Sequence, residues 1–358
     1  MEHIKANDAN QHARIEHELQ TYRDADAAYV AQMHPHLRFV HLSDLLETYS
    51  SLINRTLFLQ AMEMLSQCLQ SYSTEYSLLD PQRVWIGVEA NGNRDLYFGG
   101  FYHSNQGYRY LQQIAVFSLF GSLCGCPVDR TLITLELIRS YVHDTLHYNT
   151  YRLFVTLGEE QRVPGGSSFY RAQYGINLRL SDGTSFSAKD SVRSRTTRNL
   201  GTIMEGATDH LAHYLVSQLV QQIAYNPHES HTHDRFQVLP ISDYIYRDCM
   251  GQLTSIDILF FRELEQGKQS LPPCEHVENF KIYLKNMRLF VQYVNWRYQQ
   301  FLNDFDPQNV HQLHETILAC MLSGDIERLQ NRFNMILQRA DGFTSLFQTP
   351  AYLSPDTE

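Results

Sequence analysis

The chain has 358 residues, which is long enough to bury one large hydrophobic core or several smaller ones. Hydrophobic residues make up 43% and aromatic residues 12%, a composition that excludes an intrinsically disordered chain. The net charge of −10 argues against a nucleic-acid partner, and no apolar run approaches the roughly 20 residues that span a bilayer.

Cysteine usage and the first residues predict a chain made in a reducing compartment. The six cysteines are scattered, and only Cys124 and Cys126 lie close together. No spacing is typical of a disulfide framework or a zinc knuckle, so we expect free thiols. Residues 1–20 are polar and lack the apolar segment of a secretory signal, which predicts a cytoplasmic localisation. Injection into another cell by a signal-independent route stays open.

The first part of the chain, residues 1–82, is expected to be helical. Between Ser43 and Gln70, apolar residues recur close to helical spacing, and Ser43 is a suitable N-cap. From Arg83 onward, β-branched and aromatic runs flank an Asn-Gly-Asn turn at 91–93, which is a strong hairpin signal. A small β-sheet is therefore predicted to begin there.

Two long helices are predicted in the middle of the chain, with a second β section between them. Residues 131–154 carry a large aliphatic side chain every three or four positions without Gly or Pro. Residues 199–224 carry one continuous apolar stripe. The run SSFYRAQYGINLRLSDGTSFS between them predicts two strands joined by a tight turn at Ser181-Asp182-Gly183.

The last part of the chain, residues 241–345, is expected to be helical and to follow a polar, His-rich loop at 227–240. Apolar residues alternate steps of three and four over four heptads and stop before Pro307. A further helix begins after this proline, so an antiparallel helical hairpin is predicted within 276–338. These boundaries leave 83–226 as the middle domain.

The first middle helix carries two histidines that are spaced to share a metal ion. His143 and His147 lie four residues apart, on one helix face and about one turn from each other. Both imidazoles can therefore reach the same ion. The pair alone is a weak signal, because the chain has 17 histidines.

The second middle helix supplies acidic residues within an otherwise apolar stretch. Glu205 and Asp209 are one turn apart and share a helix face with His213. Burying a carboxylate is costly unless it is paired or binds a metal. Catalytic zinc takes three protein ligands, and two His with one Glu form an established set. The predicted zinc ligands are His143, His147 and Glu205. Asp209 is expected to accept a hydrogen bond from the free ring nitrogen of a ligand histidine.

In these two segments the sequence resembles the gluzincins, the thermolysin-like metallopeptidases. Their pattern is HExxH on one helix and a Glu ligand on a second helix, followed four residues later by an acidic residue. The segments HDTLH at 143–147 and EGATD at 205–209 correspond to it. The resemblance covers residues 131–224 and implies an α+β fold with a zincin-like core, a bound zinc ion and a protein or peptide substrate.

The residue after the first histidine departs from the family pattern. The family has a Glu there that acts as the general base, whereas this chain has Asp144, which is one methylene shorter. A misplacement on the order of 1 Å can cost roughly a hundredfold in rate. Asp144 is the predicted base, in a site that is either rebuilt around the shorter side chain or of low activity.

Stabilising a tetrahedral intermediate needs a further donor near the zinc, often Tyr, His or Arg. His231 and Tyr214 are the residues that we expect in this role, although the spacing fixes neither. Other candidates are His233, His213 and Tyr148. A group of arginines between the motif helices is a candidate contact for an acidic group of the substrate, and it consists of Arg171, Arg179, Arg193, Arg195 and Arg198.

Other interpretations compete with the peptidase. Cys124 or Cys126 beside a motif histidine would make a cysteine hydrolase, but this leaves both acidic residues unexplained. A two-metal carboxylate bundle would need Glu-x-x-His pairs on two helices, and none is in register. A helical interaction protein that keeps a structural zinc site is favoured by Asp144 and by the long C-terminal helices. The abundance of Gln, Tyr and His suggests a bacterial effector delivered into a host cell.

Overall fold

The computed structural model describes residues 2–33, 37–48, 53–73, 75–82, 84–89, 130–162, 166–179, 181, 200–224 and 297–347. Within these ranges the protein is mostly helical and contains a four-stranded and a two-stranded sheet. This combination confirms the α+β class that the sequence predicts.

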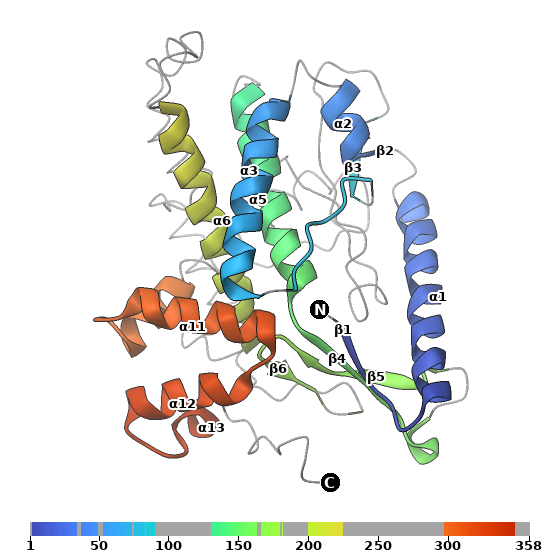
Figure 1. Ribbon diagram of the computed structural model, residues 1–358, viewed down its shortest axis with the longest axis vertical. Coiled ribbons are helices and arrows are strands. Elements are labelled where there is room, and N and C mark those ends of the chain that lie inside the picture. The colour runs from blue at the N-terminus through green and yellow to red at the C-terminus, as the bar shows by residue number, and fades with distance from the viewer. Residues whose placement is uncertain are drawn as a thin grey trace, which may run out of the picture.

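Three long helices pack side by side and stand upright in Figure 1. They are α3 (Arg55–Tyr72), α5 (Arg130–Asn149) and α6 (Leu200–Ala224). The start and end of α6 agree with the prediction to within one residue. The two helices that carry the sequence motifs are therefore direct neighbours.

The predicted end of α5 at 154 is wrong, because the helix ends at Asn149. Side chains of Asn149, Thr150 and Arg152 donate hydrogen bonds to carbonyl groups in the last turns of the helix. The last four carbonyls of a helix lack the usual donor four residues later, and the side chains of Thr150 and Arg152 bond three of them, those of Leu146, His147 and Tyr148. The chain then continues directly into a strand.

The N-terminal part is not one continuous helical region. Ser43 does not cap a helix, because it lies inside α2 (Leu42–Thr48). A separate helix, α3, begins after Asn54, whose side-chain oxygen accepts a hydrogen bond from the backbone N–H of Leu57 at 3.2 Å. An Asn in this position stabilises a helix start.

Strands flank the first helices, which the sequence did not predict. β1 (Glu2–Lys5) precedes α1 (Ala9–Met33), and β2 (Leu37–His41) follows it. β2 pairs antiparallel with β3 (Trp85–Glu89). A strand is therefore confirmed just after residue 83, whereas the hairpin predicted at 91–93 lies outside the described residues.

The four-stranded sheet lies at the C-terminal end of α5 (Figure 1). Its order is β1-β4-β5-β6, with β1 parallel to β4 and the other pairs antiparallel. The remaining elements are β4 (Arg152–Thr156), the short 3-10 helix η1 (Glu159–Gln161), β5 (Phe169–Tyr174) and β6 (Asn177–Leu178). The sheet therefore begins immediately after the helix with the histidine motif.

The sheet contains a turn that the sequence analysis did not identify. β5 and β6 are joined at Gly175 and Ile176, whereas the turn predicted at 181–183 falls largely outside the described residues. Gly175 has φ +56°, a backbone conformation that residues other than Gly rarely adopt. Its N–H also donates to the carbonyl of Tyr151 at 2.8 Å, which ties the turn to the end of α5.

The described part of the C-terminal region is helical, as predicted. Residues 297–305 are helical and end before Pro307, while 276–296, most of the first arm of the predicted hairpin, lie outside the described residues. Three helices follow Pro307 instead of one: α11 (Val310–Ser323), α12 (Ile326–Leu337) and α13 (Gly342–Phe347). The described part after Pro307 is therefore a small cluster of helices and not a single arm of a hairpin.

One large hydrophobic cluster includes side chains from all three predicted regions of the chain. Phe58 of α3, Leu146 of α5 and Ile317 of α11 are among its fully buried members. The boundary predicted at 83 and the one between 226 and 241 fall outside the described residues. The two motif helices therefore share one hydrophobic core with the N-terminal helix α3 and the C-terminal helix α11.

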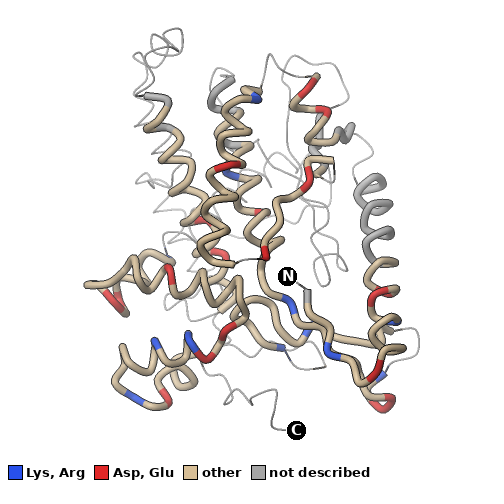
Figure 2. Tube along the Cα trace, viewed as in Figure 1, with Lys and Arg blue, Asp and Glu red and all other residues tan. Residues whose placement is uncertain are grey.

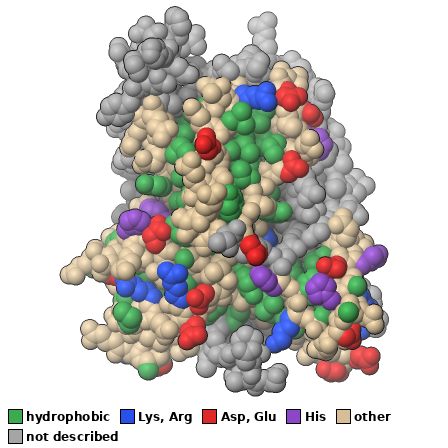
Figure 3. Space-filling model, in the orientation of Figure 1, with side chains coloured by type: hydrophobic (Ala, Val, Ile, Leu, Met, Phe, Trp, Pro, Cys, Tyr) green, Lys and Arg blue, Asp and Glu red, His purple; other side chains and the backbone are tan. Residues whose placement is uncertain are grey.

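The charged residues of the described elements are interspersed. Lys and Arg occur in β1, β4 and α12 among other places, with acidic positions between them (Figure 2). Figure 3 shows hydrophobic side chains emerging between the upright helices on the visible face. In the described part of the chain, every helix is too short or too polar to traverse a bilayer.

Gly206 allows the C-terminal region to approach α6 next to Glu205. A Cβ at this position would lie 2.4 Å from Cβ of Tyr298, which is closer than two carbon atoms can pack. Tyr298 itself is fully buried. The glycine therefore makes the contact between α6 and residues 297–305 possible.

Gly206→Ala is expected to destabilise the protein. An exposed helical Gly→Ala change gains about 1 kcal/mol, but overpacking here costs about 1–3 kcal/mol, so the helix gain is offset or exceeded. Urea unfolding measures the difference, with Gly201→Ala in the same helix as the control for helix propensity. A Gly206→Ala variant that is more stable than wild type would contradict the close contact between Gly206 and Tyr298.

Candidate metal centre

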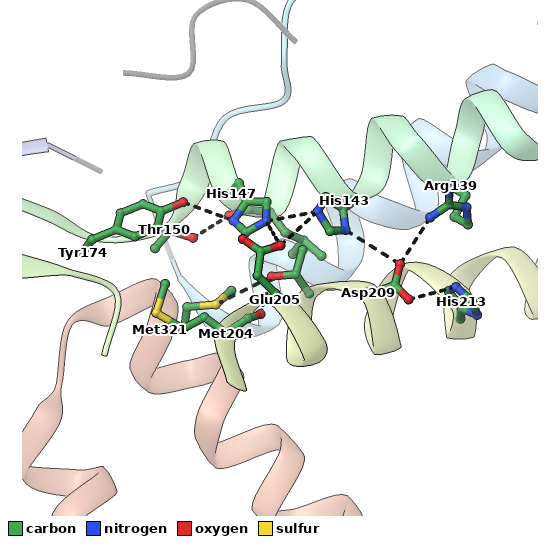
Figure 4. Close-up of polar contacts among 12 residues, drawn as sticks. Arg139, His143, His147, Thr150, Tyr174, Met204, Glu205, Asp209, His213 and Met321 are labelled. Atoms are coloured by element: carbon green, nitrogen blue, oxygen red, sulfur yellow. Dashed lines mark hydrogen bonds and ion pairs between the residues drawn. The ribbon is translucent and has the colours of Figure 1, made fainter. Parts of the chain in front are cut away.

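The histidine motif lies on the face of α5 that meets α6. Leu135, Ile138 and Leu146 are buried and fix the rotation of the helix. His143 and His147 then project toward α6, with their ring centroids 4.7 Å apart (Figure 4). The predicted arrangement of one turn on one face is confirmed.

Two carboxylates reach the same place from α6. His147 contacts Glu205, whereas His143 and Arg139, earlier in α5, lie near Asp209, later in α6. The two helices therefore run antiparallel through the site. His143 lies between the two carboxylates, near both Glu205 and Asp209.

Three potential ligand atoms converge between the helices. Nε2 of His147 lies 3.1 Å from Nε2 of His143 and 3.1 Å from Oε2 of Glu205. Nε2 of His143 and Oε2 of Glu205 are 3.5 Å apart. Tetrahedral ligands at zinc bond lengths of about 2.0–2.1 Å lie about 3.3 Å from one another. The spacing of the three atoms therefore fits one zinc ion.

The exposure of the three side chains differs in a way that suits a catalytic metal. The side chains of His147 and His143 are 5% and 17% exposed, whereas that of Glu205 is 45% exposed. Catalytic zinc sites keep one position open for water or substrate, whereas structural sites are closed by four protein ligands. Among the described residues, these three form the group that could hold a metal.

Asp209 is buried at the centre of three basic side chains. Its Oδ1 lies 3.2 Å from Nη1 of Arg139 and 3.8 Å from Nδ1 of His143, and its Oδ2 lies 3.0 Å from Nε2 of His213. Burial opposes ionisation, but His213, His143 and Arg139 hold the pKa of Asp209 far below its usual range. The carboxylate thus stays charged and faces Nδ1 of His143, the ring nitrogen that points away from Glu205, at the distance of an ion pair.

The ligand side chains favour opposite charges when no cation lies between them. Burial opposes a charged imidazole, but the carboxylates of Asp209 and Glu205 raise the pKa of His143 to about 10. Burial likewise opposes ionisation of Glu205, while His147 and His143 hold its pKa far below the usual range. Positive charge is strongly favoured at the centre of this group, whether a proton or a metal ion supplies it.

Asp144 lies within the electrostatic field of the group. Burial raises the pKa of its carboxyl, and Glu205 adds to this, while His143 and His147 act in the opposite direction. Asp144 therefore lies close enough to both histidines and to Glu205 to interact with them electrostatically.

The predicted second donors that the structure describes, Tyr214, His213 and Tyr148, do not join the group of three ligand atoms. Tyr214 is 56% exposed and lies two and a half turns beyond Glu205 in α6, on the opposite side of the helix. It influences the pKa of Tyr72 of α3 instead. His213 pairs with Asp209, so it is at the edge of the site. Tyr148 is half-buried and packs against the hydrophobic core.

Other predicted residues lie outside the described part of the chain. These are His231, His233, Cys124, Cys126, Arg193, Arg195 and Arg198. Arg171 is buried in β5, with its guanidinium carbon 4.4 Å from the ring centroid of Tyr174. It therefore contacts an aromatic side chain, and its expected role in substrate binding stays a prediction.

Sequence reasoning missed two residues that contact His147. The hydroxyl of Tyr174 lies 3.1 Å from Nδ1 of His147. Nη2 of Arg152 donates to the backbone carbonyl of His147 at 2.8 Å. Both residues lie on strands, so neither has a fixed spacing from the helical motif that a sequence pattern would reveal.

Comparisons of the chain with models of protein families, with characterised proteins and with solved structures found no match. In this chain, two imidazoles and one carboxylate converge at distances that suit a single divalent cation.

Proposed function

We propose that the chain is a zinc-dependent peptidase of the thermolysin-like type that acts on a protein or peptide substrate. The observation that carries the proposal is the triangle of ligand atoms from His143, His147 and Glu205, with edges of 3.1, 3.1 and 3.5 Å. We further propose that the two antiparallel motif helices and the adjoining sheet form a zincin-like core. Asp209 beside the first ligand histidine supports the same family pattern.

The side chains around the site have separable tasks in this reaction. A zinc ion bound by the three ligands supplies Lewis-acid polarisation of a water molecule and of the scissile carbonyl. Asp144 accepts the proton of the attacking water and passes it to the leaving amine. Asp209 keeps His143 in the orientation that leaves its Nε2 free for the metal. The exposed side of Glu205 leaves room for the substrate.

A second function is favoured by one residue. Asp144 is shorter than the Glu that the family pattern places after the first histidine. A zinc site that lacks an effective base would still hold α5 and α6 together. The alternative is therefore a zinc-binding interaction protein that is derived from a peptidase and has little or no activity.

Metal analysis tests the site itself. Purified wild-type protein is expected to contain about one zinc per chain, and His147→Ala and Glu205→Ala are expected to lose it because each removes one of three ligands. His311→Ala is the matched control, since this histidine also lies one helical turn from a Glu, Glu315, but its side chain is 85% exposed. Folded wild-type protein that binds no zinc when zinc is supplied would end the proposal.

A further inference from the structure

The ring of His147 has a close partner on the side opposite to Glu205. Its Nε2 faces Glu205 and His143, while its Nδ1 lies 3.1 Å from the hydroxyl of Tyr174. The two ring planes are inclined by only 18°, with their centroids 6.5 Å apart. Figure 4 shows Tyr174 in line with the ring of His147, pointing toward it from the end of β5.

We propose that Tyr174 is a positioning residue for the metal ligand His147, an inference that rests on the proposed zinc site. An imidazole that binds a metal through Nε2 must leave the lone pair of this atom free. The proton of the neutral ring then lies on Nδ1, which donates it to the hydroxyl oxygen of Tyr174. The phenol thus selects the tautomer and fixes the rotation of the ring.

This assignment gives the two ligand histidines different partners. His143 faces the buried carboxylate of Asp209 through its Nδ1 at 3.8 Å, as the sequence predicts. His147 has a neutral phenol at the shorter distance of 3.1 Å. A phenol adds no negative charge, so the site keeps the charge of its own ligands while the second ring is still held.

Two arginines restrict the movement of Tyr174. The guanidinium carbon of Arg171 lies 4.4 Å from the ring centroid, and that of Arg152 lies 5.5 Å from it. Arg152 is also the cross-strand partner of Tyr174 in the β4–β5 pair. Both guanidinium groups thus lie within the distance at which cation–π attraction stabilises the position of the ring.

Arg152 also connects Tyr174 to the backbone of the metal ligand. Its Nη2 donates to the carbonyl of His147 and its Nη1 to that of Tyr148, both at 2.8 Å. Arg152 is 2% exposed. His147 is therefore held at its backbone by a buried guanidinium and at its ring by the hydroxyl of a tyrosine that the same guanidinium contacts.

The turn after β5 fixes the position of Tyr174 along the strand. Gly175 has a left-handed backbone, and a Cβ there would lie 2.9 Å from Cε of Met204 and 3.0 Å from a methyl carbon of Thr150. Met204 is the residue before the ligand Glu205. The strand end, the last turn of α5 and the ligand turn of α6 are thus packed together without space for a side chain between them.

The test removes the hydroxyl alone. Tyr174→Phe is expected to bind Zn²⁺ about 10- to 100-fold more weakly than wild type in competition with a chelator. In Co²⁺-loaded protein, the visible absorption bands of the metal are expected to shift, because the angle of one ligand ring changes. In zinc-loaded wild type, ¹⁵N NMR is expected to show His147 with its proton on Nδ1.

Tyr298→Phe is the matched control. Its hydroxyl lies 2.9 Å from Nδ1 of the buried His314, so the variant loses the same kind of contact at a histidine that belongs to no ligand group. The ring and the Cβ against Gly206 remain in place. This variant is expected to keep wild-type zinc affinity and the wild-type Co²⁺ spectrum.

The outcomes separate the two proposals. Wild type that binds zinc while Tyr174→Phe shows the same affinity and Co²⁺ spectrum overturns the role of Tyr174 and leaves the zinc site standing. Equal weakening in both variants also overturns it, since loss of any buried hydroxyl would then suffice. A proton on Nε2 of His147 in the zinc-loaded wild type overturns it even if a variant fails to fold. Wild type without zinc binding overturns the proposed function.

Discussion

Asp144→Ala is expected to lower peptidase turnover by roughly 100- to 10,000-fold, the range that a positioned general base contributes, while the zinc content stays at wild-type level. The residue follows the proposed ligand His143 in α5 and is not one of the three proposed ligands. Its carboxyl lies in the field of His143, His147 and Glu205, where burial raises its pKa. Removing it deletes the proton acceptor and leaves the three ligands intact.

The measurement is cleavage of an unfolded protein substrate and of a mixed peptide library, with zinc content determined for each variant. Asp144→Asn keeps the shape of the side chain and removes its basicity, so it is expected to be as inactive as Asp144→Ala. Full activity in either variant, together with inhibition by a chelator, would place the base elsewhere in the chain.

The Asp144→Glu variant distinguishes the two proposed functions, the active peptidase and the zinc-binding interaction protein. The added methylene restores the family pattern but moves the carboxylate by on the order of 1 Å, enough to cost roughly a hundredfold in a site built for Asp. We expect the variant to be slower than wild type. Activity that arises in Asp144→Glu and is missing in wild type would favour the zinc-binding interaction protein.

Asp209→Ala is expected to destabilise the protein by about 3–5 kcal/mol, because it removes one partner of a buried charged group and leaves the others unpaired. The side chain of Asp209 is 1% exposed, and those of Arg139 and His213 are 12% and 8% exposed. Zinc affinity is expected to fall about 10- to 100-fold as well, since His143 loses the acceptor for its Nδ1. Urea unfolding and chelator competition measure the two effects.

A surface pair serves as the control for this prediction. Asp341 bonds Arg339 at 2.9 Å, but the two side chains are 61% and 58% exposed, so Asp341→Ala is expected to change stability little. An Asp209→Ala variant with wild-type stability would contradict the assigned charge network. The pKa of Asp209 is lowered in the folded protein, so its contribution is present above the unfolded pKa, near 3.9, and is lost as the pH falls further.

The parts of the fold that follow from local periodicity were predictable. α6 was predicted almost to the residue, because its apolar stripe continues without interruption to Ala224. The end of α5 was not, since Leu153 and Phe154 continue a helix-like apolar pattern although they belong to β4. Side-chain bonds to the carbonyls of its last turn accompany the end of the helix, including those from Arg152, and the spacing of apolar residues does not reveal such bonds.

The strands depend on partners that are distant in the sequence. β1 consists of the polar run EHIK, and its register places Glu2 beside Arg152. These four residues alone do not predict a strand, because it is the pairing with β4 that defines it. The turn at Gly175 was missed for a related reason, because the Asp-Gly pair at 182–183 is the stronger local signal, while Gly175 is required by crowding from Met204 and Met321.

The candidate site shows the same division. His143 and His147 on one helix, and Glu205 and Asp209 on another, were predictable because helical spacing fixes which side chains share a face. That the two faces meet was inferred from the family resemblance and agrees with the distances between their atoms. Tyr174 was not predictable, since it reaches the site from a strand whose placement only the folded chain defines.

The contact between Gly206 and Tyr298 has a consequence for dissecting the protein. The ligand turn of α6 faces the histidines on one side and rests on residue 298 on the other. A fragment cut to residues 131–224 would retain every proposed zinc ligand, yet it would expose to water the apolar side of the helix that carries Glu205. The segment with the proposed ligands is therefore not an independent unit, because a part of the chain without a recognised motif completes its packing.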